Sequence, residues 1–358
     1  MKFRKATAAY EAWLGKRLAL IESDLNLKHQ AMRTSRFPFL RATYYRWAQT
    51  FPEVCAGLAS AVTVLGVGDL HVENFGTWRD VEGRLVWGIN DFDEAYPIPY
   101  THDLVRLAAS ANMAIEENHL RLDPRQAAEA ILEGYADALR IGGRPFVLAE
   151  GHPAVREMAI HRLRDPEAYW QKLEKLPPMQ DGIRPSAVRV MKSMFPEPGI
   201  PYTIAHRCAG LGSLGRERFV AIAVYRGGHI AREAKALAAS ACVWANGDRG
   251  PDGILYQRVL DRSVRCHDPF VALRGRWIVR RLAPDCSRIE MASLPEQRDE
   301  IKLLRAMGFE TANVHLGSVK GKAILKDLKK REGSWLHRAA HRMVDAVTED
   351  WEDWRKAP

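Results

Sequence analysis

Three residues with oxygen-bearing side chains, Asp69, Asn74 and Asp91, follow short apolar runs in the first third of the chain. Asp69 and Asn74 lie in GVGDLHVENFG, residues 66–76, and Asp91 lies in WGINDFDEA, residues 87–95. A carboxylate can take a proton from a hydroxyl, and Mg²⁺ prefers oxygen ligands. Because Asn74 comes five positions after Asp69, one short loop can present a base and a metal ligand, as in phosphoryl-transfer enzymes.

The same motifs and their surroundings contain further candidates. We expect His71 to support the catalytic loop by hydrogen bonding, with metal ligation or a partly buried polar position as alternatives. Asp93 is a second candidate metal ligand, although Asp93 and Glu94 also suit an ion pair with an arginine such as Arg106. Arg41 is a candidate for binding substrate or phosphate, and a solvated surface arginine is the alternative.

A glycine-rich motif, GLGSLG at residues 210–215, predicts a loop whose backbone amides cover nucleotide phosphates, since glycine permits close approach. The motif alone is weak evidence. Lys235, twenty residues after its last glycine and beyond a strand-like run, lies where a strand-borne lysine would reach the α- and β-phosphates. The residues predicted to bind the nucleotide are Gly210, Gly212, Ser213, Gly215 and Lys235.

Strands and helices must position these groups. Residues 62–67 and 85–89 are predicted to be buried strands that end at the motifs. Apolar residues recur at helical spacing over 4–33, 39–50, 102–119, 124–140, 153–175 and 295–316, with a basic amphipathic tail to about 354. Short apolar or alternating runs at 217–225, 228–234, 254–260 and 276–282 predict strands, with a short helical stretch at 235–246.

This order predicts an α+β protein with five regions. Residues 175–202 contain six prolines and little periodicity, so we expect a linker there. The predicted regions are an N-terminal helical segment (1–60), a catalytic-loop and metal-motif part of a helical lobe (61–174), the linker (175–202), a small β-rich nucleotide-binding lobe (203–290) and C-terminal helices that return to the helical lobe (291–358).

The motifs GDLHVEN and NDFDEA resemble the catalytic loop and metal motif of the aminoglycoside-phosphotransferase and protein-kinase-like superfamily. PYTHDLVRLAAS resembles the segment that follows the metal motif there, which implies that Asp103 opens a helix and steadies the catalytic loop. The resemblance implies a two-lobed kinase-like fold, with ATP and Mg²⁺ as cofactors and an unidentified hydroxyl-bearing acceptor, more plausibly a small molecule than a protein.

A closer resemblance is to a bacterial family of unassigned function. Its signature is matched by RFPFLRATYY, GDLHVENFG, NDFDEA and HDLVRLAAS, and the likeness continues through GLGSLGRERFVAI, REAK, QRVLDRS and IVRRLAP, over most of residues 30–316. This resemblance assigns no substrate.

The catalytic motifs precede the glycine motif and Lys235, the reverse of the order in ordinary kinases. We therefore predict a circular permutation, with extra helices at both ends. It requires His315, at the end of the 295–316 helix, to lie near the strand at 62–68. The partner of Lys235 is open, because residues 236–247 contain no acid, and Glu233 and Asp252 are the nearest alternatives.

Composition restricts the other functions. The longest charge-free run, residues 54–68, is short for a membrane span, and the N-terminal sequence lacks the apolar core of a signal peptide, so we expect a cytoplasmic protein. The five cysteines form no CxxC pair. A net charge of +9 suits phosphorylated ligands and also nucleic acid, which is the less favoured partner.

Three other functions stay open. A metallophosphoesterase would use Asp69 and His71 as a DxH motif, but the chain has no GNH or HxH. A pseudokinase and a nucleotidyltransferase would both use the kinase-like site. Neither the acceptor nor the oligomeric state follows from the sequence.

Overall fold

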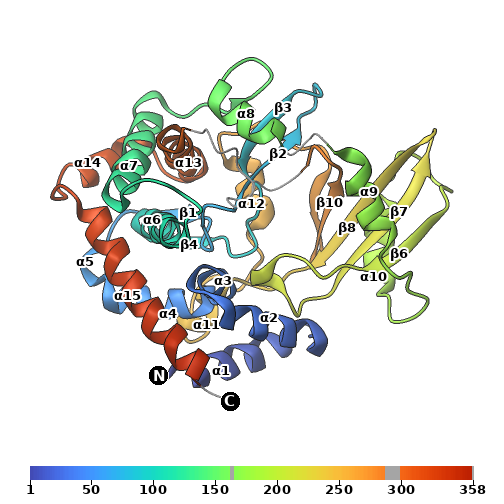
Figure 1. Ribbon diagram of the computed structural model, residues 1–358, viewed down its shortest axis with the longest axis horizontal. Coiled ribbons are helices and arrows are strands. Elements are labelled where there is room, and N and C mark those ends of the chain that lie inside the picture. Colours follow the sequence, from blue (N-terminus) through green and yellow to red (C-terminus); the bar gives the residue numbers. More distant parts are fainter. Residues whose placement is uncertain (162–164, 287–298, 357–358) are drawn as a thin grey trace.

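The computed structural model describes residues 1–161, 165–286 and 299–356, which form a mixed α+β structure (Figure 1). One part is mainly helical and holds two small sheets. The other part is built on a five-stranded antiparallel sheet, which lies at the right of Figure 1. No helix in the described ranges has both the length and the apolar composition that a membrane span requires.

The helical part combines segments from both ends of the chain. Its N-terminal helices are α1 (Phe3–Gly15), α2 (Glu22–Thr34), α3 (Arg36–Ala42), α4 (Tyr44–Val54) and α5 (Ala56–Ala59). Its other helices are α6 (Tyr100–Glu116), α7 (Pro124–Ile141), α8 (Pro153–His161), α13 (Glu300–His315), α14 (Gly321–Leu328) and α15 (Trp335–Lys356).

Helices α7 and α13 pack backbone against backbone. A Cβ added at Gly134 would lie 1.8 Å from the Arg305 carbonyl oxygen, and one added at Gly308 would lie 2.0 Å from the Ile131 carbonyl oxygen. Only glycine leaves room for this crossing.

Two small sheets carry the motifs that contain Asp69 and Asp91. Strand β1 (Thr63–Gly66) pairs antiparallel with β4 (Tyr96–Pro99), and β2 (Phe75–Arg79) pairs with β3 (Leu85–Ile89), which also pairs with the short β5 (Phe146–Val147). The hairpin between β2 and β3 brings the chain back to the loop that contains Asn74. There the Asn90 amide donates to the Asn74 carbonyl oxygen at 3.1 Å.

The five-stranded sheet has the order β6-β7-β8-β10-β9. Its strands are β6 (Tyr202–His206), β7 (Arg218–Tyr225), β8 (Gly228–Ala236), β9 (Val271–Arg274) and β10 (Trp277–Leu282), and the short helices α11 (Ala241–Ala245) and α12 (Tyr256–Arg262) lie between β8 and β9. The first six residues of β7 are all buried, because helices cover both faces of the sheet. This explains why the sequence there is continuously apolar after its first residue instead of alternating.

The proline-rich segment, expected to be a linker, wraps around the β6 edge of this sheet. Helix α9 (Pro166–Glu174) precedes the segment and places Leu173 against Val220 and Ile222 on one face. The Met179 amide donates to the Ile204 carbonyl oxygen at 2.7 Å at the edge. Helix α10 (Pro185–Lys192) contacts the other face, where Trp277 Nε1 donates to Ser186 Oγ at 3.0 Å. The predicted boundary at 290/291 lies outside the described residues.

Most predicted elements are confirmed. The prediction of a strand at residues 254–260 is wrong. These residues belong largely to α12, which buries Tyr256 and Val259 on one face. A short apolar run fits either a strand or a buried helix, so periodicity could not separate them. The predicted helix at 235–246 shrinks to α11, because Lys235 and Ala236 continue β8.

The end of α13 lies against β1, as the predicted permutation requires. His315 Nε2 is 2.9 Å from Asp103 Oδ2, and that same oxygen accepts from the Val67 amide at 2.7 Å. Ser318, just after α13, accepts a hydrogen bond from the Leu65 amide at 2.8 Å. The expected proximity of His315 to this strand is therefore confirmed.

Candidate active site

A buried carboxylate holds the candidate catalytic loop, GDLHVEN, at its first turn. Asp103, in the first turn of α6, accepts from the Val67 and Gly68 amides at 2.7 and 2.9 Å and contacts His315. Burial alone would raise the pKa of Asp103, but the His102 ring, whose Nδ1 lies 3.8 Å away, and the hydrogen bond with His315 outweigh it and hold the pKa well below its usual range. Asp103 thus has the loop-steadying position that the resemblance implied.

Asp69 is fixed by an arginine on one side and faces a glycine on the other. Arg106 Nε donates to Asp69 Oδ1 at 3.0 Å and its Nη2 contacts the same oxygen, while Asp69 Oδ2 would lie 3.1 Å from a Cβ at Gly212. Arg106 is fully buried and also donates to the Leu40 carbonyl oxygen at 2.8 Å. Burial raises the pKa of Asp69, and Arg106 opposes that shift.

The suggested pairing of Arg106 with Asp93 or Glu94 is therefore wrong. Arg216 takes that place: its Nη2 donates to Glu94 Oε1 at 2.9 Å, and its Nη1 lies 3.8 Å from Asp93 Oδ2. The sequence interpretation missed Arg216, although it directly follows Gly215 at the end of the glycine motif.

His71 and Asn74 shape the rest of the loop. His71 Nδ1 accepts from the Glu73 amide at 3.2 Å, and the His71 ring meets the Phe37 ring edge-on. Asn74 Nδ2 donates to the Asp69 carbonyl oxygen at 2.8 Å, so its amide oxygen is the atom available to a cation. The position of His71 fits the loop-supporting role.

Lys235 of β8 reaches the metal motif from the other part of the molecule. Its Nζ lies 3.5 Å from Asp91 Oδ1 and 2.5 Å from Asp93 Oδ2. Burial lowers the pKa of Lys235, and the two carboxylates oppose that shift. Burial and the neighbouring Asp91 raise the pKa of Asp93, against the effect of Lys235.

The lysine's partners are thus the metal-motif aspartates. Glu233 pairs instead with Arg207 and with Arg218, the latter at 3.1 Å. Asp252 lies 3.8 Å from Arg17 of the N-terminal segment. Neither of the acids that the sequence offered forms an ion pair with Lys235.

The glycine motif forms a tight turn directly over Asp69. Residues Leu211–Ser213 make one turn of 3-10 helix, and Gly210 and Gly215 have positive φ angles of 75° and 94°. A Cβ at Gly212 would lie 2.9 Å from the Arg41 carbonyl oxygen, closer than real Cβ atoms come. Close approach of the turn to the last residues of α3 therefore explains why this position is glycine.

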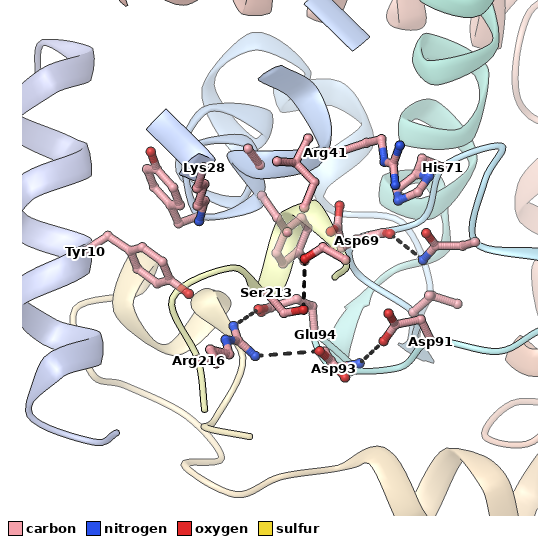
Figure 2. Close-up of a pocket in the computed structure, with 18 residues that line it drawn as sticks. Tyr10, Lys28, Arg41, Asp69, His71, Asp91, Asp93, Glu94, Ser213 and Arg216 are labelled. Carbon is pink, nitrogen blue, oxygen red and sulfur yellow. Dashed lines mark hydrogen bonds and ion pairs between the residues drawn. The ribbon is translucent and has the colours of Figure 1, made fainter. Parts of the chain in front are cut away.

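These groups line one cavity of about 580 Å³, its open mouth included (Figure 2). Eight of the ten predicted site residues lie in its wall: Asp69, His71, Asn74, Asp91, Asp93, Gly210, Gly212 and Ser213. Lys235 lies behind Asp91 and Asp93, and Gly215 faces Leu25. The N-terminal helices add Tyr10, Lys28, Arg41, Tyr44 and Tyr45. Arg41, Tyr44 and Tyr45 belong to RFPFLRATYY, whereas Tyr10 and Lys28 lie outside the motifs that the sequence offered.

The oxygen atoms of the site suit a small hard cation. Asp93 Oδ1 is buried without a hydrogen-bond partner, and Asp91 and Asn74 open onto the same cavity. Mg²⁺ commonly uses one or two carboxylates and completes its shell with water and phosphate oxygens. Across the described ranges, no three His, Cys, Asp or Glu side chains form a preassembled metal cluster.

Comparison with known proteins gives a match to one family model over part of the chain. Residues 20–161 match the model of a family described as an uncharacterized protein conserved in bacteria (DUF2252). The matched segment contains the catalytic loop and the metal motif and ends before the glycine motif and Lys235. Neither the curated proteins nor the solved structures gave a significant match.

Proposed function

We propose that this protein is a kinase-like phosphotransferase that uses ATP and Mg²⁺ to phosphorylate a hydroxyl of a small molecule. One observation carries the proposal: Lys235 and Gly212, encoded well over a hundred residues after the catalytic motifs, contact Asp91, Asp93 and the surroundings of Asp69. A shared site of base, metal ligands, lysine and glycine turn is the arrangement that phosphoryl transfer to a hydroxyl needs.

In this mechanism the acceptor hydroxyl lies against Asp69 Oδ2. The acceptor oxygen forms a bond to the γ-phosphorus while the bond from that phosphorus to the β–γ bridging oxygen breaks, so ADP leaves and Asp69 takes the hydroxyl proton. Arg106 holds Asp69 Oδ1 and fixes the direction of the free oxygen. The amides of the glycine turn and Lys235 bind phosphate oxygens.

Asp91, Asp93 and Asn74 would hold Mg²⁺. Bound there, the ion would neutralise charge on the phosphate oxygens. Lys235 then has phosphate oxygens as alternative partners to the carboxylates that it contacts in this structure.

Labelled ATP distinguishes the competing functions. We expect the γ-phosphate, and not the α-phosphate, to appear on a small-molecule acceptor when the protein is incubated with Mg²⁺, ATP and a low-molecular-weight bacterial extract. Transfer of the α-label would show a nucleotidyltransferase. Nucleotide binding without transfer of either label would indicate a pseudokinase.

Asp91→Asn should remove most of the effect of Mg²⁺ on nucleotide affinity. In the wild type we expect Mg²⁺ to tighten binding of a non-hydrolysable ATP analogue, and in the variant we expect this gain to fall by about tenfold or more. The fold should survive, because Asp93 still pairs with Lys235. Calorimetric titration with and without Mg²⁺ measures the difference. Asp181→Asn, at an exposed position, is the charge-matched control.

Gly212→Val should weaken nucleotide binding by roughly tenfold to a hundredfold, the range expected for overpacking of about 1–3 kcal/mol. The new side chain would push the turn away from the Arg41 carbonyl oxygen and the Asp69 carboxylate. Gly228→Val is the control, because a Cβ there meets nothing closer than 3.9 Å. Equal affinity of both variants for the ATP analogue would contradict a phosphate-binding role for the turn.

A further inference from the structure

The cavity wall formed by the N-terminal helices is basic and aromatic. It comprises Tyr10, Lys28, Arg41, Ala42, Tyr44 and Tyr45, and it contains no carboxylate. The acids of the cavity, Asp69, Asp91, Asp93 and Glu94, all come from the catalytic loop and the metal motif. The wall that faces the proposed base is therefore suited to an anionic ligand.

Most polar side chains of this wall already form a hydrogen bond or an ion pair within the protein. Tyr44 Oη lies 3.1 Å from Cys242 Sγ, and Tyr45 Oη lies 2.8 Å from Thr7 Oγ1. Arg41 pairs with Glu73 at 2.5 Å.

Of the two cations of this wall, Lys28 is the one without such a partner. Its side chain lines the cavity with only 4% of the residue's surface exposed, and within the described ranges it forms no hydrogen bond or ion pair. Its ammonium group lies over the face of the Tyr45 ring, with Nζ 5.9 Å from the ring centroid. Burial lowers the pKa of Lys28 to about 8, against the attraction of Glu11. A buried ammonium is unfavourable unless an anion accompanies it.

Lys28 and Asp91 lie at different ends of the labelled group of side chains in Figure 2, with Asp69 between them. The nucleotide phosphates of the proposed mechanism belong at the Asp91 end, beside Lys235. The Lys28 end is therefore left for the acceptor.

We propose that Lys28 binds an anionic group of the acceptor, so that the substrate is a hydroxyl compound that also carries a carboxylate or a phosphate. This inference rests on the proposed phosphotransferase function. It separates the protein from enzymes that act on polycationic aminoglycosides, because a cationic acceptor would meet Lys28 and Arg41 instead of acids.

Calorimetry with two probes, inorganic phosphate and citrate, tests the site in the full chain. Each anion is titrated into wild type, Lys28→Met and Lys5→Met, the last being an exposed lysine of α1. Each titration is repeated with a non-hydrolysable ATP analogue and Mg²⁺ bound, which occupies the nucleotide site. We expect at least one anion to bind wild type and Lys5→Met in both states, and Lys28→Met to bind it about tenfold or more weakly.

Lys28→Met should be at least as thermally stable as wild type without anions, because it removes an unpaired buried cation and keeps an apolar stem. The binding loss would then be local. Anion binding that is absent, or equal in Lys28→Met, would overturn the proposal.

The remaining outcomes separate the two proposals. If the anions compete with the ATP analogue and Lys28→Met weakens binding of the analogue, Lys28 belongs to the nucleotide site and the acceptor assignment fails. If wild type binds anions through Lys28 but binds no nucleotide, the phosphotransferase proposal fails, and the acceptor assignment fails with it, while an anion site at Lys28 stands.

Discussion

Asp69→Asn is expected to lower the rate of phosphoryl transfer by about 10²–10⁴, the usual contribution of a positioned general base. The asparagine keeps an oxygen for Arg106 but cannot accept the hydroxyl proton. Nucleotide affinity should change little, because Asp91, Asp93 and Lys235 are intact. Release and transfer of γ-labelled phosphate measure the rate, and titration with the ATP analogue measures the affinity.

Asp69→Asn also removes the charge of a buried ion pair, which could by itself lower the rate. The control variant must therefore lose a comparable ion pair. Asp80 is a buried carboxylate paired with Arg84 at 2.7 Å and lies outside the cavity. Asp80→Asn should cost stability but leave transfer near the wild-type rate. An Asp69→Asn protein with full transfer activity would remove Asp69 from the role of base.

The pH profile gives an independent check on Asp69. Because burial raises its pKa above the ordinary value, the rate of transfer should rise with pH as the Asp69 carboxyl ionises. In Asp69→Asn this acidic limb should disappear, whereas Asp80→Asn should keep it.

Asp103→Asn is expected to lower the free energy of unfolding by about 3–5 kcal/mol, the cost of breaking a buried charged network. Asp103 is fully buried and accepts from the Val67 and Gly68 amides and from His315, and an amide cannot accept from all three. Urea denaturation measures the loss. Asp345→Asn, in an exposed pair with His341, should cost about 1 kcal/mol or less.

The stabilisation by Asp103 should depend on pH with a defined sign. Its folded-state pKa is depressed, so the contribution is complete above the unfolded-state value of about 3.9 and is lost as the pH falls towards the folded-state value. The stability difference between wild type and Asp103→Asn should therefore shrink in acid. A difference that stayed constant below the unfolded-state pKa would contradict this assignment.

The contact between Asp103 and His315 also allows a test of whether the end of α13 supports β1. Asp103→Asn and His315→Gln should be non-additive, because their side chains are 2.9 Å apart. Additive losses would mean that the end of α13 does not support β1 through this contact.

Local sequence patterns were sufficient where an element has a clear period or a marked end. The strand that includes Val64 and the helix that begins near Asp103 formed where predicted. The pattern failed for the residues around Tyr256, because a short apolar run is compatible with strand or helix. It also gave no sign that the proline-rich segment would wrap the five-stranded sheet, since that depends on surfaces formed elsewhere in the chain.

Order and spacing in the sequence identified the reactive candidates, because a loop of fixed length constrains Asp69 and Asn74 to act together. The tertiary structure alone decided the partners. In the structure Arg106 pairs with Asp69, Arg216 pairs with Glu94, and Lys235 pairs with the metal-motif aspartates. The fold also brought Lys28 of an N-terminal helix to the cavity. Side chains far apart in the sequence meet only through packing, and burial then decides which charges must pair, so these contacts carry no local signal.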